Sequence, residues 1–126
     1  MITIEIAIEL HNDLIDLFGG SKGIRDKSGL EAAVARPYMT FDQQYLYPSA
    51  FEKAAAILES LIINHPFIDG NKRIAYTLMQ LILLDYNLYL VVTENEQYEF
   101  VIAASIGEMR FDDIKTWLEN NTSPLS

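Results

Sequence analysis

The sequence contains no cysteine and only two histidines among its 126 residues. Disulfide bonds, thiolate nucleophiles, cysteine-ligated zinc or iron sites and three-histidine metal sites are therefore excluded. Basic residues are also scarce, because 9 lysines and arginines stand against 18 aspartates and glutamates, for a formal net charge of −9. This charge opposes a general attraction to nucleic-acid phosphates, so we expect no direct nucleic-acid binding.

Long apolar runs are missing as well. Glu, Asp, Lys or Arg interrupts each apolar stretch before about 18 residues are reached, which predicts no membrane-spanning helix. The segment MITIEIAIEL has two glutamates and no basic leader, so it does not match a secretory signal. We therefore expect a cytoplasmic protein without a membrane partner, and its length predicts one domain over 1–126.

Helical periodicity accounts for most of the chain and predicts an all-α helical bundle with a short hairpin or strand. The first helix is expected over 3–18. A second, shorter helix is expected to begin at a capping box formed by Ser28 and Glu31 and to reach Arg36. The stretch 37–48 lacks helical periodicity, and we interpret it as an exposed loop or small hairpin.

Two longer helices are expected over 49–64 and 71–86. In the first, Lys53 and Glu59 belong to a polar face opposite an apolar one, so this helix is predicted to be half-buried. The second is apolar nearly all round, which is typical of a helix at the centre of a bundle.

The C-terminal third is predicted to hold a short strand over 88–92 and two further helices. The first of these begins at a Thr93–Glu96 capping box and extends toward Gly107. The final residues, NTSPLS, are expected to fray. The last helix is expected to bury Ile114, Trp117 and Leu118.

The most informative segment is HPFIDGNKR at 65–73, which stands directly before the apolar helix. Gly70 and Asn71 allow positive φ, so consecutive backbone N–H groups can converge on an anion. Lys72 and Arg73 oppose the dipole at a helix N-terminus, and an anionic ligand is a reason to tolerate them there. The segment predicts a phosphate site, against the alternative of two solvated surface cations.

Two side chains at the mouth of this segment could carry chemistry. His65 could accept a proton from a hydroxyl nucleophile, or it could simply cap helix carbonyls. Asp69 is a hard oxygen ligand suited to Mg²⁺, although Asp before Gly is also a common turn former. Phe67 is expected to anchor the loop in the core, His11 to pack or cap, and GGSKGIRD to be a structural turn, since no P-loop pattern is present.

HPFIDGNKR resembles the HPFx[D/E]GN[G/K]R signature of Fic proteins, and the chain is similar to the death-on-curing (Doc) branch of that family. The likeness extends through GGSKGIRD, LEAAVARP and LYPSAFEKAAAIL. It implies a compact all-α Fic fold with the motif between two central helices. The resemblance also implies roles for six residues: His65 as general base, Asp69 as Mg²⁺ ligand, Gly70 and Asn71 as phosphate nest, Lys72 as a phosphate contact, and Arg73 as a phosphate and transition-state contact.

Lys72 decides which reaction the resemblance implies. AMP-transferring Fic enzymes have Gly at this position, whereas the Doc branch has lysine and binds ATP in a reversed pose that presents the γ-phosphate. The implied activity is a toxin kinase that uses ATP and Mg²⁺ to phosphorylate a Thr or Ser of a protein such as elongation factor Tu, arresting translation. Pro66 and Gly70 follow the Fic pattern instead, so AMP or UMP transfer stays open, as does a catalytically weak antitoxin-binding module.

The resemblance also bears on regulation and targeting. Many Fic enzymes carry an inhibitory [S/T]xxxE[G/N] helix, but Leu90 and Lys115 occupy the required Ser or Thr positions before the two Glu-Asn pairs. This implies inhibition in trans by a cognate antitoxin with a disordered tail. The segment 37–47 matches the position of the Fic target-docking flap, with a structural connector as the alternative.

Overall fold

The computed structural model describes residues 1–125, and these form six α-helices, a 3₁₀ turn and two small antiparallel strand pairs. The predicted all-α helical bundle with a short hairpin or strand is confirmed. The first helix, α1 (Ile4–Phe18), begins after Thr3, whose side chain accepts the N–H of Ile6. A threonine oxygen at this position satisfies one of the unpaired N–H groups of the first turn.

The second helix, α2 (Lys27–Ala35), is capped differently from the prediction. Asp26 is the N-cap, and its Oδ1 accepts the N–H of Gly29 at 3.0 Å. The Ser28–Glu31 capping box is therefore wrong. A carboxylate two positions earlier supplies the same acceptor and adds a charge that favours the helix dipole.

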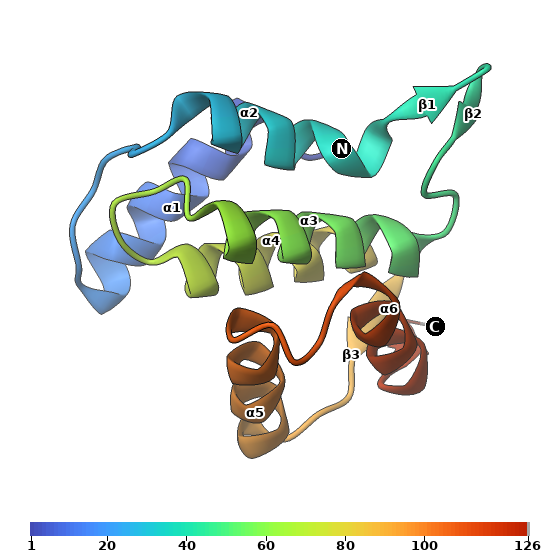
Figure 1. The fold of residues 1–126 in the computed structure, drawn as a ribbon. Helices are drawn as coiled ribbons and strands as arrows, with labels where there is room; N and C mark the ends of the chain where they lie inside the picture. Colours follow the sequence, from blue (N-terminus) through green and yellow to red (C-terminus); the bar gives the residue numbers. More distant parts are fainter. Residues whose placement is uncertain (126) are drawn as a thin grey trace.

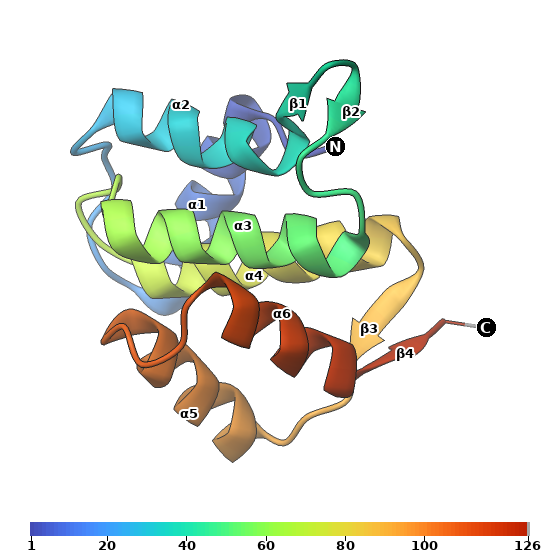
Figure 2. The same cartoon turned by 45° about the vertical axis from the view of Figure 1, so that its right-hand side comes forward.

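Two helices of equal length, α3 (Ala50–Asn64) and α4 (Asn71–Asp85), lie side by side at the centre of the molecule. Figures 1 and 2 show α1 and α2 on one side of this pair, with α5 (Glu94–Ser105) and α6 (Phe111–Asn120) on the other. The predicted capping box of α5, Thr93 with Glu96, is present. The predicted central position of α4 is confirmed, and α3 shares it.

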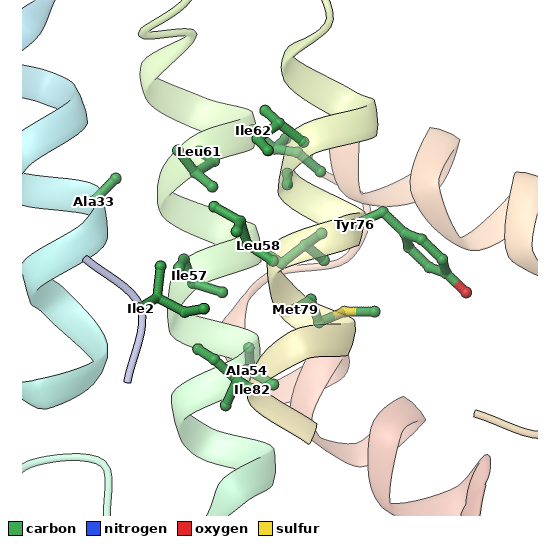
Figure 3. Close-up of a cluster of buried hydrophobic side chains, with 14 of the residues drawn as sticks. Ile2, Ala33, Ala54, Ile57, Leu58, Leu61, Ile62, Tyr76, Met79 and Ile82 are labelled. Atoms are coloured by element: carbon green, nitrogen blue, oxygen red, sulfur yellow. The ribbon is translucent and has the colours of Figure 1, made fainter. Parts of the chain in front are cut away.

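The prediction of a half-buried α3 is wrong, because this helix is buried on nearly every side. Figure 3 shows its apolar residues, such as Leu58 and Ile62, packed against α4. On the other face, Lys53 is only 1% exposed, and its Nζ donates to the carbonyls of Tyr47 at 2.5 Å and Pro48 at 3.2 Å. Polar residues on this face are buried because other segments supply their partners.

The stretch 37–48 continues from the 3₁₀ turn η1 (Arg36–Tyr38) into a small hairpin, which confirms one of the two predicted forms. Its strands, β1 (Thr40–Phe41) and β2 (Gln44–Tyr45), are exposed and antiparallel. Positive φ at Asp42 and Gln43 forms the turn.

The predicted strand after α4 is present as β3 (Leu88–Leu90). The predicted fraying of the C-terminal segment is wrong within the described residues, because β4 (Thr122–Pro124) pairs with β3 in antiparallel register; Ser126 lies outside them. Pairing satisfies backbone groups on both strands that would otherwise depend on water. No helix within residues 1–125 is long and apolar enough to cross a membrane.

The two ends of α3 differ in what surrounds them. The loop from α3 to α4 lies beside the loop from α1 to α2 at one end of the molecule, and the hairpin lies at the other end (Figures 1 and 2). A helix of this length separates its ends by about 22 Å. Residues 65–70 and residues 40–45 are therefore at opposite ends of the molecule.

Candidate functional site

His65 ends α3 in the left-handed region, with φ 46° and ψ 56°, and its side chain is exposed. Arg25 bonds the carbonyls at this helix end, with Nε donating to His65 O at 2.8 Å and Nη2 to Asn64 O at 2.7 Å. Because Arg25 satisfies these carbonyls, the imidazole is not needed as a cap. A non-glycine residue held in this conformation is typical of functional sites.

The segment GGSKGIRD, residues 19–26, holds the motif loop in place. The N–H groups of Arg25 and Asp26 donate to Pro66 O at 2.8 and 3.0 Å, and the N–H of Ile68 donates to Gly23 O at 3.0 Å. A bridge between Ile24 and Phe67 completes the contact. The prediction of a structural turn is confirmed, and this turn positions the residues that follow His65.

Asp69 is exposed, and each of its carboxylate oxygens accepts one backbone N–H, Oδ1 from Gly70 at 2.8 Å and Oδ2 from Ser21 at 3.1 Å. A Cβ on Gly20 would lie 2.7 Å from Oδ2, so the loop approaches this closely only because Gly20 has no side chain. Each oxygen keeps capacity for a further contact.

Asp69 fits the requirements of a magnesium ligand. Residues 1–125 contain no group of three His, Asp or Glu side chains that could hold a metal alone. Mg²⁺ bound to a nucleotide needs only one or two protein carboxylates, because phosphate oxygens and water complete its octahedron. The donor set is therefore suited to a metal that arrives with a phosphate ligand.

The Asn71 side chain is bonded to the motif loop itself. Its Oδ1 accepts the N–H of Phe67 at 3.0 Å, and its Nδ2 donates to Phe67 O at 2.9 Å. Both ends of the amide are therefore used to close the loop. The backbone N–H of Asn71 is therefore the group of this residue that remains to bind a ligand.

The N-terminus of α4 faces outward and is not capped. Gly70 is left-handed, with φ 73°, and no side chain caps the helix. Within the described chain, the N–H groups of residues 71–73 have no acceptor, and neither Lys72 nor Arg73 is in an ion pair. Arg73 instead lies over the Phe18 ring, 4.5 Å from its centroid. Unpaired donors, the helix dipole and two exposed cations together fit an anionic group.

Two hollows adjoin this helix end, and a third adjoins His65. The loop hollow, about 350 Å³, is lined by His65, Ile68 and residues 69–73. The aromatic hollow, about 710 Å³, also includes Lys72 and Arg73 and continues along α4 between α1 and α5. The junction hollow, about 290 Å³, adjoins His65 on its other side. The aromatic hollow is further lined by residues such as Phe18, Tyr76 and Tyr98, and the junction hollow by Glu59, Ser105, Met109 and Arg110.

The predicted site residues His65 and 69–73 are brought together around the loop hollow. Sequence reasoning missed Arg25 and Ser21, which hold the loop, and it gave His11 only a general packing role. Their partners are 40, 48 and 58 residues away along the chain, so no local spacing could reveal the contacts. The one available signal was the density of glycines and cations in GGSKGIRD.

Comparisons with known proteins identify the family of this chain. A family model described as "Fic/DOC family" matches residues 1–83. A protein named Toxin Doc from Mycolicibacterium smegmatis is 51% identical over 59 residues, which are 47% of this chain and 45% of that protein. The alignment thus spans slightly less than half the length of this relative. Because the family model covers well over half of the sequence, the chain belongs to the Fic/DOC family.

Proposed function

We propose that the protein is the toxin of a toxin-antitoxin module and acts as a protein kinase that transfers the γ-phosphate of ATP to a Ser or Thr hydroxyl. The relative named Toxin Doc supports the toxin assignment. The exposed His65 beside an uncapped helix N-terminus supports a phosphate-transfer enzyme. Elongation factor Tu is the proposed target, in line with the resemblance to the Doc branch.

The arrangement of the hollows is the observation that favours transfer of the γ-phosphate over transfer of a nucleotidyl group. Lys72 and Arg73 line both the loop hollow and the aromatic hollow, so a nucleotide can run from one to the other past these cations. A base in the larger, aromatic hollow would leave the terminal phosphate nearest His65. Tyr98 and Phe18 offer aromatic faces of the kind that bind a base.

In this pose His65 accepts the proton of the target hydroxyl while the hydroxyl oxygen forms a bond to the γ-phosphorus. The bond from that phosphorus to the bridging oxygen breaks, and ADP leaves. Backbone N–H groups at residues 71–73 and the Arg73 guanidinium bind phosphate oxygens and stabilise their charge. Mg²⁺, held by Asp69, would neutralise phosphate charge when bound.

Nucleotidyl transfer is the second candidate, and the junction hollow favours it. A nucleoside placed there, next to His65, would bring the α-phosphate to the loop and direct the leaving pyrophosphate toward Lys72 and Arg73. The junction hollow is less than half the size of the aromatic hollow, at about 290 against 710 Å³. The larger hollow supports the kinase.

ATP labelled separately on its α- or γ-phosphate, incubated with the protein and a bacterial lysate, tests the proposal. We expect γ-label on protein, and retention of α-label would overturn the kinase. His65→Asn is the control, because Asn tolerates the left-handed backbone at this position. Loss of a general base should lower the transfer rate by about 10²- to 10⁴-fold. Growth arrest that persists with His65→Asn would favour a binding module instead of an enzyme.

A pair of variants distinguishes the two hollows. If the base occupies the aromatic hollow, Tyr98→Ala should raise the KM for ATP while Met109→Ala, in the junction hollow, leaves it unchanged. The opposite result would assign the base to the junction hollow and favour nucleotidyl transfer. Tyr98 is 67% exposed, so its removal should have little effect on stability.

The hairpin does not have the position that a target-docking segment requires. Its strands lie beyond the N-terminal end of α3, while His65 is at the C-terminal end, about 22 Å along the helix. A target paired with 40–45 would hold its hydroxyl far from the imidazole. The structural-connector alternative is therefore favoured, and the segment beside His65 is the α1–α2 loop. For regulation, we propose a cognate antitoxin acting in trans.

A further inference from the structure

His11 is the one histidine that the proposed chemistry does not use, and it is 1% exposed within the bundle. Its Nε2 lies 2.7 Å from the carbonyl oxygen of Asp69. A carbonyl can only accept, so this bond assigns the proton to Nε2. Nδ1 is buried and has no partner within residues 1–125, so the bond to Asp69 is the ring's one polar contact there.

The motif loop wraps around this imidazole. The ring stacks on Phe67 with centroids 3.8 Å apart and planes 6° apart. A Cβ on Gly70 would lie 3.5 Å from Nε2, so the backbone passes close to the ring on that side too. His11 therefore contacts the loop on both sides of the Asp69 carbonyl.

The bond to Asp69 fixes the direction of the peptide between Asp69 and Gly70. In a trans peptide the C=O and the following N–H point in opposite directions, so an inward carbonyl turns the Gly70 N–H away from the core. That N–H meets Asp69 Oδ1 at 2.8 Å. Gly70 tolerates either sign of φ, so glycine alone does not prevent this peptide from reversing. A reversed peptide would direct a carbonyl oxygen toward the anion.

We propose that His11 is a positioning residue that holds the Asp69–Gly70 peptide so that the phosphate site presents N–H groups and no carbonyl oxygen. This inference rests on the anion site of the proposed function, and it extends that site to α1. His11 contributes through one hydrogen bond and touches no substrate. Its effect should therefore appear in anion affinity and in the Gly70 amide.

Two variants separate the hydrogen bond from the packing. His11→Phe keeps a ring that can stack on Phe67 and removes the donor. His11→Gln removes the ring and keeps a side-chain N–H at similar reach. Val34→Ala serves as the control for lost stability, because this residue is buried in α2 and lines neither the loop hollow nor the aromatic hollow.

Inorganic pyrophosphate is the probe, followed through the amide resonances of residues 70–73 in nuclear magnetic resonance spectra. We expect His11→Phe to weaken pyrophosphate binding by about tenfold or more and to shift the Gly70 amide, because a buried carbonyl loses its partner. The Kd of His11→Gln for pyrophosphate should stay within about threefold of the wild-type value, and that of Val34→Ala should equal it.

The outcomes distinguish this inference from the kinase proposal. Wild-type affinity in His11→Phe, or equal losses in His11→Gln and His11→Phe, would overturn the positioning role and leave the kinase standing. Pyrophosphate binding that depends on the His11 donor in a protein that transfers no γ-phosphate would support the positioning role and overturn the kinase. A wild-type protein that does not bind pyrophosphate would overturn both.

Discussion

The charges around α3 form two groups that the fold treats in opposite ways. In the middle of the helix, the Glu59 carboxylate is nearly buried and is bonded by Arg36 Nη1 at 2.9 Å, Arg110 Nε at 3.1 Å and the N–H of Phe111 at 2.7 Å. At the C-terminal end, Lys72 and Arg73 are exposed beside a helix terminus that opposes them. The paired charges join α3 to η1 and to the start of α6, whereas Lys72 and Arg73 are in no ion pair within residues 1–125.

Pairing within the fold separates the charges that stabilise this small acidic domain from those that can bind a ligand. A charge with every hydrogen bond satisfied inside the fold stabilises the fold and has little capacity left for a ligand. A charge placed against the local field and engaged in no ion pair costs stability and is available for a ligand. Each group should therefore respond differently when it is neutralised.

Neutralising Glu59 should have the largest effect. Glu59→Gln leaves Arg36 without its charge partner in a partly buried setting and should lower the free energy of unfolding by about 3 to 5 kcal/mol. Denaturant unfolding measures this change, with exposed Glu31→Gln as a control expected within about 0.5 kcal/mol of the wild type. A loss below about 1 kcal/mol would show that the paired group is not architectural.

Glu59→Gln should also change how the free energy of unfolding depends on pH. Burial raises the pKa of the Glu59 carboxyl, but hydrogen bonds from Arg36 and Arg110 outweigh it, so the pKa lies below its ordinary value of 4.5. A carboxyl whose pKa is lowered on folding stabilises the folded state at pH values above its ordinary pKa. This stability is lost as pH falls through the pKa of the folded state. The stability of Glu59→Gln should therefore decline less between neutral and acidic pH.

Neutralising Lys72 should have a smaller effect, divided between binding and stability. Lys72→Gln should weaken MgATP binding by about tenfold, because a charge-assisted phosphate contact is lost. It should also raise the free energy of unfolding by about 0.3 to 1 kcal/mol, because a cation leaves a helix N-terminus. Calorimetric titration and denaturant unfolding measure the two changes.

Lys27→Gln is the matched control for Lys72. Lys27 is exposed at the first position of α2, so it also lies in the first turn of a helix, but it lies outside the loop hollow. It should show a similar gain in stability with no loss of MgATP affinity. Equal losses of affinity in both variants would reduce the role of Lys72 to general electrostatics.

Removing the hydroxyl of Tyr76 should have the smallest effect of these variants. It adds a third case to the comparison, an uncharged polar group. This hydroxyl is buried without a partner in residues 1–125, so Tyr76→Phe should raise the free energy of unfolding by up to about 1 kcal/mol. Burial raises the pKa of Tyr76 to about 12. Because the folded state holds this proton more tightly than the unfolded state, the free energy of unfolding should fall as pH rises from the ordinary value of 10 toward 12, and Tyr76→Phe should not show this fall.

Absorbance of the phenolate during an alkaline titration measures the ionisation of Tyr76. One tyrosine should ionise near pH 12 in the wild type, and Tyr76→Phe should remove this step. If the variant is less stable than the wild type, the hydroxyl has a partner in solution and belongs with the paired groups.

Local sequence signals predicted most of the helices. The cap at Thr93 acts within three residues, and the apolar stretch of α4 defines its own central position. The errors arose where a partner is distant in the sequence. Glu59 and Lys53 were assigned to a solvent face because Arg110, 51 residues away, and the carbonyls of a loop could not be anticipated.

The same division applies to the candidate site. Its chemical residues are contiguous, so HPFIDGNKR identified them together. The residues that hold the segment in shape are not, since Arg25, Ser21 and His11 come from the first helix and the loop after it. A motif predicts which groups are present, and only the fold shows that the Asn71 side chain is already occupied.

The position of α5 has a consequence for how proteins of this kind diversify. Residues 94–102 line the aromatic hollow, residues 104–110 line much of the junction hollow, and all of them follow the segment 1–83 that the family model matches. Substitutions there can change what enters either hollow while the loop that carries His65 is left intact. Ligand choice thus depends in part on a segment outside the matched region, whereas the proposed chemistry rests on residues within it.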